Sequence, residues 1–162
     1  MGLHFTIFLL GLAATAQAAT LNVSFSPDTL FASPGGTVQF SGSLTNTTDA
    51  TVFLNGDSFT FDIPNAVDDF PFLSDAPISL GPNASSGIFS FLNITVPGDQ
   101  ATGTYNGVFT VSGGADPSTL DSVGSAPFHL VVNPVVGVPE PGSALLLGVG
   151  LAALFWRRPT SS

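Results

Sequence analysis

Residues 96–113 read VPGDQATGTYNGVFTVSG, a turn-rich segment followed by alternating side chains. In its second half, Tyr105, Phe109 and Val111 recur at even spacing together with Gly107, and polar residues stand between most of them. Such alternation is typical of a half-buried β-strand, because successive side chains of a strand point to opposite faces of the sheet. The Pro-Gly-Asp near the start of the segment indicates a turn ahead of that strand. The segment therefore predicts a strand that follows a tight connection.

The same pattern recurs along the chain between the two ends, where turn residues separate short apolar-alternating runs and no window shows helical periodicity. An Asn55-Gly56 pair predicts a hairpin between two of these runs. The sequence therefore predicts an all-β fold, an immunoglobulin-like antiparallel β-sandwich of about seven strands over residues 19–134. The predicted strands cover residues 21–25, 38–44, 52–54, 59–63, 87–96, 105–111 and 128–132.

The segment before Tyr105 resembles a tyrosine corner, in which a Tyr hydroxyl bonds back to the backbone just ahead of a strand. The alternative is a ligand-stacking role for Tyr105, which is the single Tyr of the chain. We expect the structural role. The sequence of residues 96–113 also resembles that of cell-surface immunoglobulin-like repeat modules over one hairpin.

Composition excludes several classes of function. The chain has 162 residues, a net charge of -9 and 8% charged residues, and both basic residues, Arg157 and Arg158, stand near the C-terminus. A surface without Lys or Arg does not bind phosphate or nucleic acid, since such binding needs a basic footprint. The absence of Cys excludes disulfides, thiolate metal sites and a cysteine nucleophile.

Residues 1–18 have the pattern of a secretory signal peptide. An apolar run precedes Ala16-Gln17-Ala18, which places small residues where a signal peptidase requires them. We expect passage through the secretion translocon and cleavage before Ala19. The alternative is a buried N-terminal helix, which fits the cleavage-like sequence less well.

The C-terminal region combines three features in a fixed order. A linker over residues 135–142 carries Pro139-Glu140-Pro141-Gly142, and an apolar segment over residues 143–156 follows it. Trp156 ends this segment as an interfacial anchor, and Arg157 and Arg158 begin a basic tail over residues 157–162. The prolines place the start of a helix after them. The predicted transmembrane helix is short for a ~30 Å hydrocarbon core, so a transient membrane stop is favoured over a permanent anchor. A glycolipid-anchor signal is disfavoured because such a signal ends in apolar residues.

The order of Pro-Glu-Pro, apolar helix and arginines over residues 138–158 resembles the PEP-CTERM sorting signal of Gram-negative bacteria. The resemblance implies that exosortase, a membrane-embedded protease or transpeptidase, removes the tail at the outer face of the inner membrane. It implies recognition through Pro139, Glu140 and Pro141, with Arg157 and Arg158 as the cytoplasmic lock. The same family also carries an ice-binding label, from which we infer no function.

An acidic loop over residues 62–75 is the one candidate metal site. Asp68, Asp69 and Asp75 offer oxygen ligands of the kind that Ca²⁺ prefers, but their spacing does not match an EF-hand. The simpler interpretation is a solvated loop. Binding of a partner is also possible, since Phe70 and Phe72 would be partly exposed there.

No residue pattern predicts catalysis, so we expect no enzyme and no cofactor. His129 alternates with core residues and belongs on the outer face of a strand, without a second His or a Cys for Zn²⁺. Nothing resembles a nucleophile elbow, and the single Glu belongs to the sorting motif.

The expected function is that of an exported protein with a structural or adhesive role at the cell surface, in biofilm or exopolysaccharide. The alternative is a small carbohydrate- or Ca²⁺-dependent binding module, although Trp and Tyr are scarce for stacking on sugars. Asn-x-Ser/Thr sequons occur at four positions, which chance explains in a chain rich in Asn and Thr: Asn22, Asn46, Asn83 and Asn93.

Overall fold

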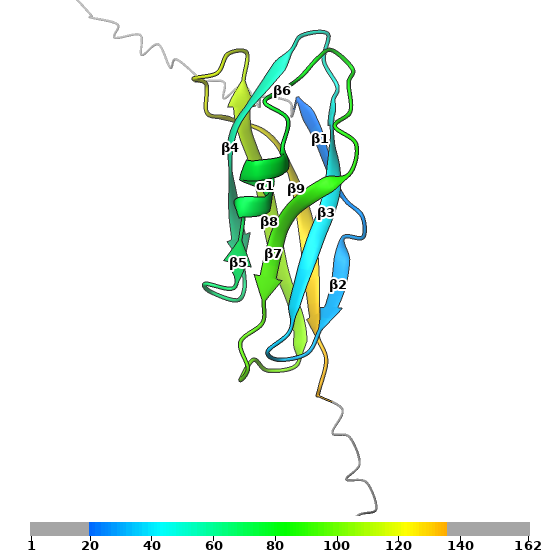
Figure 1. Cartoon of the computed structure of the whole chain (residues 1–162), viewed down its shortest axis with the longest axis vertical. Helices are drawn as coiled ribbons and strands as arrows, with labels where there is room; N and C mark the ends of the chain where they lie inside the picture. The colour runs from blue at the N-terminus through cyan, green and yellow to red at the C-terminus, as the bar shows by residue number, and fades with distance from the viewer. Residues whose placement is uncertain (1–19, 136–162) are drawn as a thin grey trace, which may run out of the picture.

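The computed structural model describes residues 20–135, which form two β-sheets packed face to face with one short helix beside them (Figure 1). The four-stranded sheet has the order β1 (Leu21–Phe25), β3 (Thr37–Asn46), β7 (Phe89–Thr95) and β5 (Val67–Asp68). The five-stranded sheet has the order β2 (Thr29–Ala32), β9 (Asp121–Val132), β8 (Gly103–Gly114), β4 (Val52–Phe61) and β6 (Ser79–Leu80). Helix α1 (Phe70–Asp75) lies between β5 and β6 in the chain.

The predicted sandwich is confirmed, and its strand order is that of the immunoglobulin constant type. Strands β1, β3, β7 and β5 take the places of strands A, B, E and D, and β9, β8 and β4 those of G, F and C. The chain passes from one sheet to the other between Phe25 and Thr29, and β2 then runs parallel to β9. Residues 20 and 135 lie toward opposite ends of the long axis (Figure 1).

The strand count differs from the prediction for two reasons: two predicted strands around Asn55 form one strand, and the structure has three further short strands. Asn55 and Gly56 form no hairpin; they lie in a bulge of one continuous strand, β4, whose two halves both pair with β8. A type I′ turn requires a positive φ at both central residues, and neither of these two residues has one. The structure also adds β2, β5 and β6, so the described region has nine strands instead of about seven.

The core is built from aromatic side chains of both sheets. Phe25 stands at its centre, and its ring centroid lies between 5.1 and 6.2 Å from those of Phe40, Phe91, Phe109 and Phe128 in edge-to-face arrangements. Each buried Phe contributes about 1.5–3 kcal/mol through removal of its surface from water, and edge-to-face pairs add to this. Aromatic packing therefore stabilises a domain whose sequence offers no Lys or Arg for ion pairs.

One glycine makes room for this packing. Gly107 faces the ring of Phe128, and a Cβ atom built at Gly107 would overlap that ring. Phe61 also packs on Phe128 in a stacked arrangement, with ring centroids 5.3 Å apart. The sheet can therefore hold the two phenyl rings only where β8 has no side chain.

The two targeting segments predicted from the sequence lie outside the described residues. These are the signal peptide over residues 1–18 and the Pro-Glu-Pro linker, transmembrane helix and basic tail from residue 136 onward. Within residues 20–135, no helix is long and apolar enough to cross a membrane.

Candidate functional site: the acidic edge of the sandwich

The outer face of the four-stranded sheet is polar and largely bonded to itself. Ser24 Oγ lies 3.1 Å from Ser43 Oγ across β1 and β3, and Gln39 Nε2 donates to Asn93 Oδ1 at 3.1 Å across β3 and β7. Cross-strand pairs of this kind stabilise a sheet. Part of this polar face is thus bonded within the sheet, and the exposed large apolar side chains lie outside its strands.

The outer face of the five-stranded sheet carries His129. Its Nδ1 lies 2.9 Å from Asn106 Oδ1, and the backbone N–H and side-chain amide of Asn106 donate to Asp62 Oδ2 at 2.7 and 3.3 Å. The row Asp62–Asn106–His129 thus orients the imidazole on the outer face, where the alternation of β9 predicts it. Its neighbours in the row are an amide and a carboxylate, so the row itself contains no nucleophile for a catalytic triad.

Half of the carboxylates of the described region are concentrated along one edge of the sandwich. Asp and Glu number 11, and the single Glu is Glu140, so ten Asp fall within residues 20–135. We call the side formed by β4 from Asn55 onward, β5, α1 and the chain up to Ile78 the acidic edge. Its five carboxylates belong to Asp57, Asp62, Asp68, Asp69 and Asp75.

The three metal candidates are not brought together as ligands. Asp68 Oδ1 accepts a hydrogen bond from Phe70 N at 3.1 Å, and Asp75 Oδ1 accepts one from Ser74 Oγ at 2.9 Å. Asp69 is the N-cap residue of α1, and its backbone oxygen accepts from Phe72 N at 3.0 Å. In the part of the chain that the structure describes, no group of three or more His, Cys, Asp or Glu is placed to hold a metal ion.

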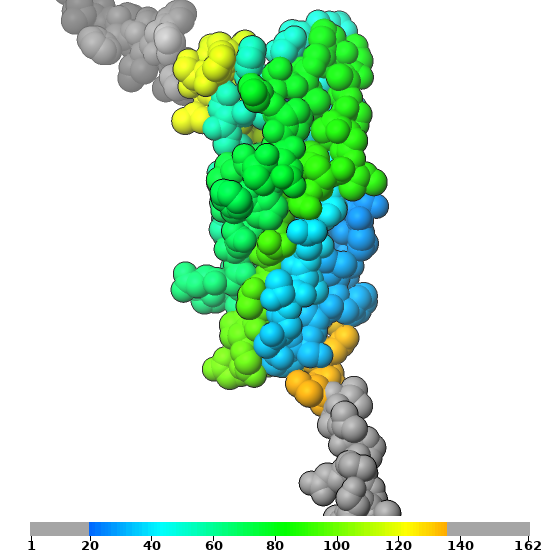
Figure 2. Space-filling view, viewed as in Figure 1, coloured from blue at the N-terminus to red at the C-terminus, as the bar shows by residue number. Residues whose placement is uncertain are grey.

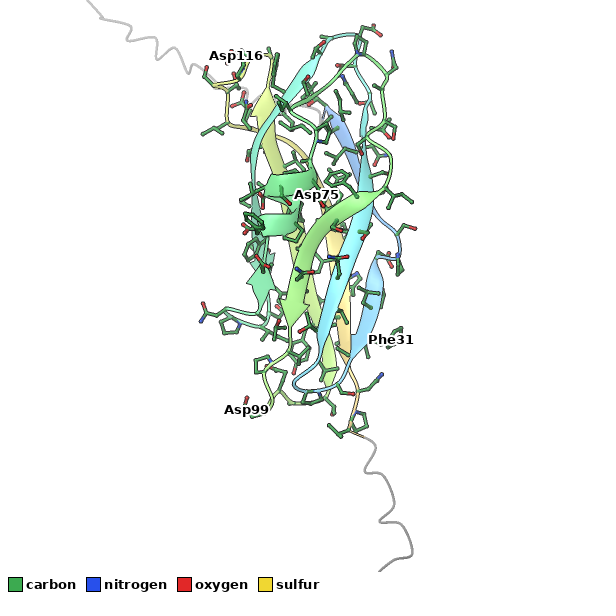
Figure 3. The ribbon with its side chains drawn as sticks, viewed as in Figure 1. Phe31, Asp75, Asp99 and Asp116 are labelled. Carbon is green, nitrogen blue, oxygen red and sulfur yellow. The ribbon has the colours of Figure 1, made fainter. Side chains whose placement is uncertain are left out.

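Other carboxylates lie far from this edge. Figure 3 shows Asp75 in the middle of the molecule, on α1, while Asp99 and Asp116 lie at opposite ends of the sandwich. Asp116 accepts hydrogen bonds from Ser118 Oγ at 2.6 Å and from the backbone N–H groups of Ser118 and Thr119. These bonds favour the carboxylate form and hold the pKa of Asp116 below its usual value.

Asp57 is the residue of this edge that sequence analysis missed. It pairs with Val111 of β8, and therefore lies on the core-facing side of β4. Its Oδ2 atom is buried and accepts no hydrogen bond. Burial, and then the nearby charge of Asp69, raise the pKa of Asp57 to about 6. The signal was present in the sequence, since Asp57 has the same parity as Phe59 and Phe61, which face the same side.

Exposed apolar side chains accompany the carboxylates. Phe59 on β4 is 38% exposed, and Phe70 and Leu73 on α1 and Ile78 beyond it are 68%, 58% and 80% exposed. The expected exposure is correct for Phe70 and wrong for Phe72, which is buried against Phe91 and Phe109. Figure 2 shows residues of α1 at the surface of this face.

A groove of about 200 Å³ lies between α1 and β4. Its lining is mostly apolar, and comes from the bulge of β4 on one side and from the helix and the chain after it on the other. The lining residues are Leu54, Asn55, Gly56, Phe72, Leu73, Ala76, Pro77 and Ile78. The acidic edge therefore offers apolar anchors between carboxylates.

Tyr105 belongs to the framework of the fold. Its hydroxyl donates to the backbone oxygen of Ala101 at 2.8 Å, and Gln100 Nε2 donates to the same hydroxyl at 2.7 Å. The bond joins the start of β8 to the connection from β7, which is the position of a tyrosine corner. The hydroxyl is thus engaged in the connection between the two sheets.

Comparison with protein families identifies the C-terminal signal. Residues 137–158 match the PEP-CTERM protein-sorting motif. This match confirms the resemblance seen in the sequence over residues 138–158. The PEP-CTERM motif implies an exported protein that an exosortase sorts and processes. The residues assigned to recognition and to the cytoplasmic lock, from Pro139 to Arg158, lie within the match.

Other comparisons are weaker. No curated protein matches the chain. Among solved structures, native alpha-2-macroglobulin from Escherichia coli, from domain MG7 to the C-terminus, is 21% identical with a TM-score of 0.47, over 72% of this chain and 17% of that one. The secreted serine protease VesC from Vibrio cholerae is 13% identical with a TM-score of 0.47, over 80% of this chain and 26% of that one. The chain thus spans a small part of either structure, and these likenesses say nothing about its function.

Proposed function

We propose that the protein is a non-enzymatic bacterial surface or extracellular-matrix protein with a structural or adhesive role in biofilm or exopolysaccharide. The observation that carries the proposal is the PEP-CTERM motif at residues 137–158, which begins five residues after β9 ends at Val132. The sandwich therefore lies directly before the sorting signal.

The proposed route has three steps. The signal peptide over residues 1–18 directs the chain to the secretion translocon and is cleaved before Ala19. The apolar segment over residues 143–156 then holds the chain in the inner membrane, with Arg157 and Arg158 on the cytoplasmic side. Exosortase recognises Pro139, Glu140 and Pro141 and releases the sandwich to the cell surface or the extracellular matrix.

Support for a non-enzymatic role comes from the arrangement of reactive groups. His129 is bonded to the side-chain amide of Asn106, which stands between the imidazole and Asp62, and the carboxylates of the acidic edge lie beside exposed apolar side chains. A rigid aromatic core and a self-bonded polar sheet face suit a domain that serves as a building block. The alternative of a Ca²⁺-dependent module lacks support from the described carboxylates, which serve local turns.

The test replaces the recognition element in the producing bacterium. Glu140→Ala, combined with Pro139→Ala and Pro141→Ala, should leave the protein in the membrane fraction, while the unaltered chain appears at the surface or in the matrix. Thr160→Ala, beyond the arginines, is the matched control and should be sorted normally. Normal sorting of the triple variant would contradict the proposal.

A further inference from the structure

We propose that the open edge of β4 binds an extended, basic segment of a partner protein, which adds a strand to the five-stranded sheet. This inference names a partner class for the proposed adhesive role and rests on that role for where the partner is met. Strand addition draws its affinity from backbone hydrogen bonds and its specificity from alternate side chains. Three features support the proposal: the unpaired edge of β4, the exposed apolar side chains beside it, and the negative charge of the acidic edge.

The edge of β4 is open over most of its length. Strand β6 pairs only with Val52 and Phe53, and the N–H of Leu54 donates to Ile78 O at 2.9 Å. From residue 55 to 61, β4 has β8 on one side and, among the described residues, no backbone partner on the other. Residues 58–60 are exposed. Seven residues of strand extend about 23 Å at roughly 3.3 Å each, enough for a bound peptide strand.

The backbone groups that face the open side follow from one hydrogen bond. The N–H of Asp62 donates to Asn106 O at 3.1 Å, so the backbone N–H and C=O groups of Asp62 are directed toward β8. Along an antiparallel strand, the backbone N–H and C=O groups of successive residues are directed alternately toward the two neighbouring strand positions. Asp57, Phe59 and Phe61 therefore direct their N–H and C=O groups to the open side.

Apolar anchors lie beside this backbone. Phe59 is on β4 itself, and Phe70 and Leu73 are on α1, which packs against β7 and reaches β4. The groove between α1 and the bulge of β4 can accept a side chain of an added strand. Exposed apolar groups that gather into one patch are typical of an interaction surface.

Charge decides which partner fits. The five carboxylates of the acidic edge have no Lys or Arg near them, because residues 20–135 contain neither. A second copy of this chain would bring equal negative charge to the edge, and like charges directly opposite each other destabilise a pair of strands. A basic segment instead brings opposite charge to the edge, and complementary charge favours the encounter and fixes the register.

The experiment uses the full chain in detergent and a fluorescent eight-residue peptide of alternating Lys and Val as the probe. We expect binding that weakens about tenfold or more between 50 and 500 mM salt, because surface charges are screened. Hydrogen exchange should slow at the amides of Asp57, Phe59 and Phe61. A peptide of alternating Glu and Val should not bind.

Matched variants separate strand addition from plain charge attraction. Phe59→Pro removes one N–H that faces the open side and should reduce affinity by about tenfold, the loss of one hydrogen bond. Phe59→Ala keeps this N–H and should lose less affinity for the peptide than Phe59→Pro does. If Phe59→Pro does not fold, the Lys-Val peptide carrying N-methyl groups on its edge-facing amides tests the same bonds and should not bind.

Three results would overturn the proposal: binding of the N-methylated peptide as tight as that of the unmodified one, slowed exchange on strands other than β4, or pairing of β4 with β4 in a dimer. None of these bears on sorting. Failure of the sorting test would leave the peptide result intact, and the reverse also holds.

Discussion

The hydroxyl of Tyr105 donates a hydrogen bond to the backbone oxygen of Ala101 at 2.8 Å. Gln100 Nε2 donates to that hydroxyl from the same connection, so three residues of one loop and the strand after it are tied together. The connection joins β7 of one sheet to β8 of the other. The bond therefore fixes how the chain crosses between the layers.

Tyr105→Phe should lower the free energy of unfolding by about 1 kcal/mol, since it removes this bond and leaves the side chain of Gln100 without its acceptor. Urea unfolding at pH 7 measures the change. Thr104→Ala, at the exposed neighbouring position, should change the free energy by less than about 0.5 kcal/mol. Equal effects of the two substitutions would contradict a special role for the hydroxyl.

Asn46→Ala should destabilise the domain more severely. The Asn46 amide is fully buried and donates to the backbone oxygens of Ala50, Leu80 and Gly81, while its Oδ1 accepts from Thr48. Its loss leaves several buried polar groups unpaired, at about 1–3 kcal/mol for each group that water does not reach. We expect a loss of about 3 kcal/mol in urea unfolding.

The same burial makes a prediction about the sequons. Asn46 should carry no glycan in the folded protein, because both of its amide hydrogens are engaged. Asn22 and Asn83 are exposed and serve as the comparison. Peptide mapping of the exported protein that found a glycan on Asn46 would contradict the buried network.

Gly107→Ala should be strongly destabilising, by about 3 kcal/mol or more, because the added methyl group overlaps the ring of Phe128. Gly56→Ala is the control on the neighbouring strand, since a Cβ atom there meets nothing within 4 Å. Thermal melting of both variants compares the two sites. A melting midpoint of Gly107→Ala close to that of Gly56→Ala would contradict the packing described for Phe61 and Phe128.

Asp57→Asn should stabilise the domain at pH 7 and have little effect near pH 4. Burial raises the pKa of Asp57 from 3.8 to about 6, so the folded state holds a proton that the unfolded state releases. The free energy of unfolding of the unaltered chain therefore falls as the pH rises from about 4 to about 6. The gain at pH 7 should be about 1 kcal/mol, since the carboxylate is only partly buried.

Unfolding curves across this pH range test the assignment. Asp99→Asn removes an equal charge from an exposed loop at one end of the sandwich (Figure 3), and it should produce no comparable change in slope between pH 4 and 6. A pH dependence of Asp57→Asn that matches the unaltered chain would show that another group is responsible.

The alternation from Tyr105 to Val111 predicted most of β8, whereas only residues 128–132 of β9 were predicted and its first half, from Asp121, was missed. The Asn55-Gly56 pair misled because a bulge and a hairpin share the same residues, and the partner strand β8 decides between them. Helix α1 begins at Phe70 and has six residues, which is too short for a helical period to show.

The candidate site was partly visible in the sequence. The acidic loop was recognised, and a solvated loop, a metal site and a partner-binding surface stayed open for it because the directions of its side chains depend on α1. Phe72 and Phe70 differ in burial although they stand two residues apart, since a helix turns one inward and the other outward. Asp57 shares the parity of Phe59 and Phe61, and its pairing with Val111 confirms that it lies on the core-facing side.

The intact mass of the protein recovered from its native bacterium tests the central claim most directly. Exosortase-type sorting predicts a chain that begins at Ala19 and ends near Pro139 to Pro141. A mass that retains residues 143–162 would contradict processing, and the sandwich would then be a tethered domain instead of a released or surface-fixed one.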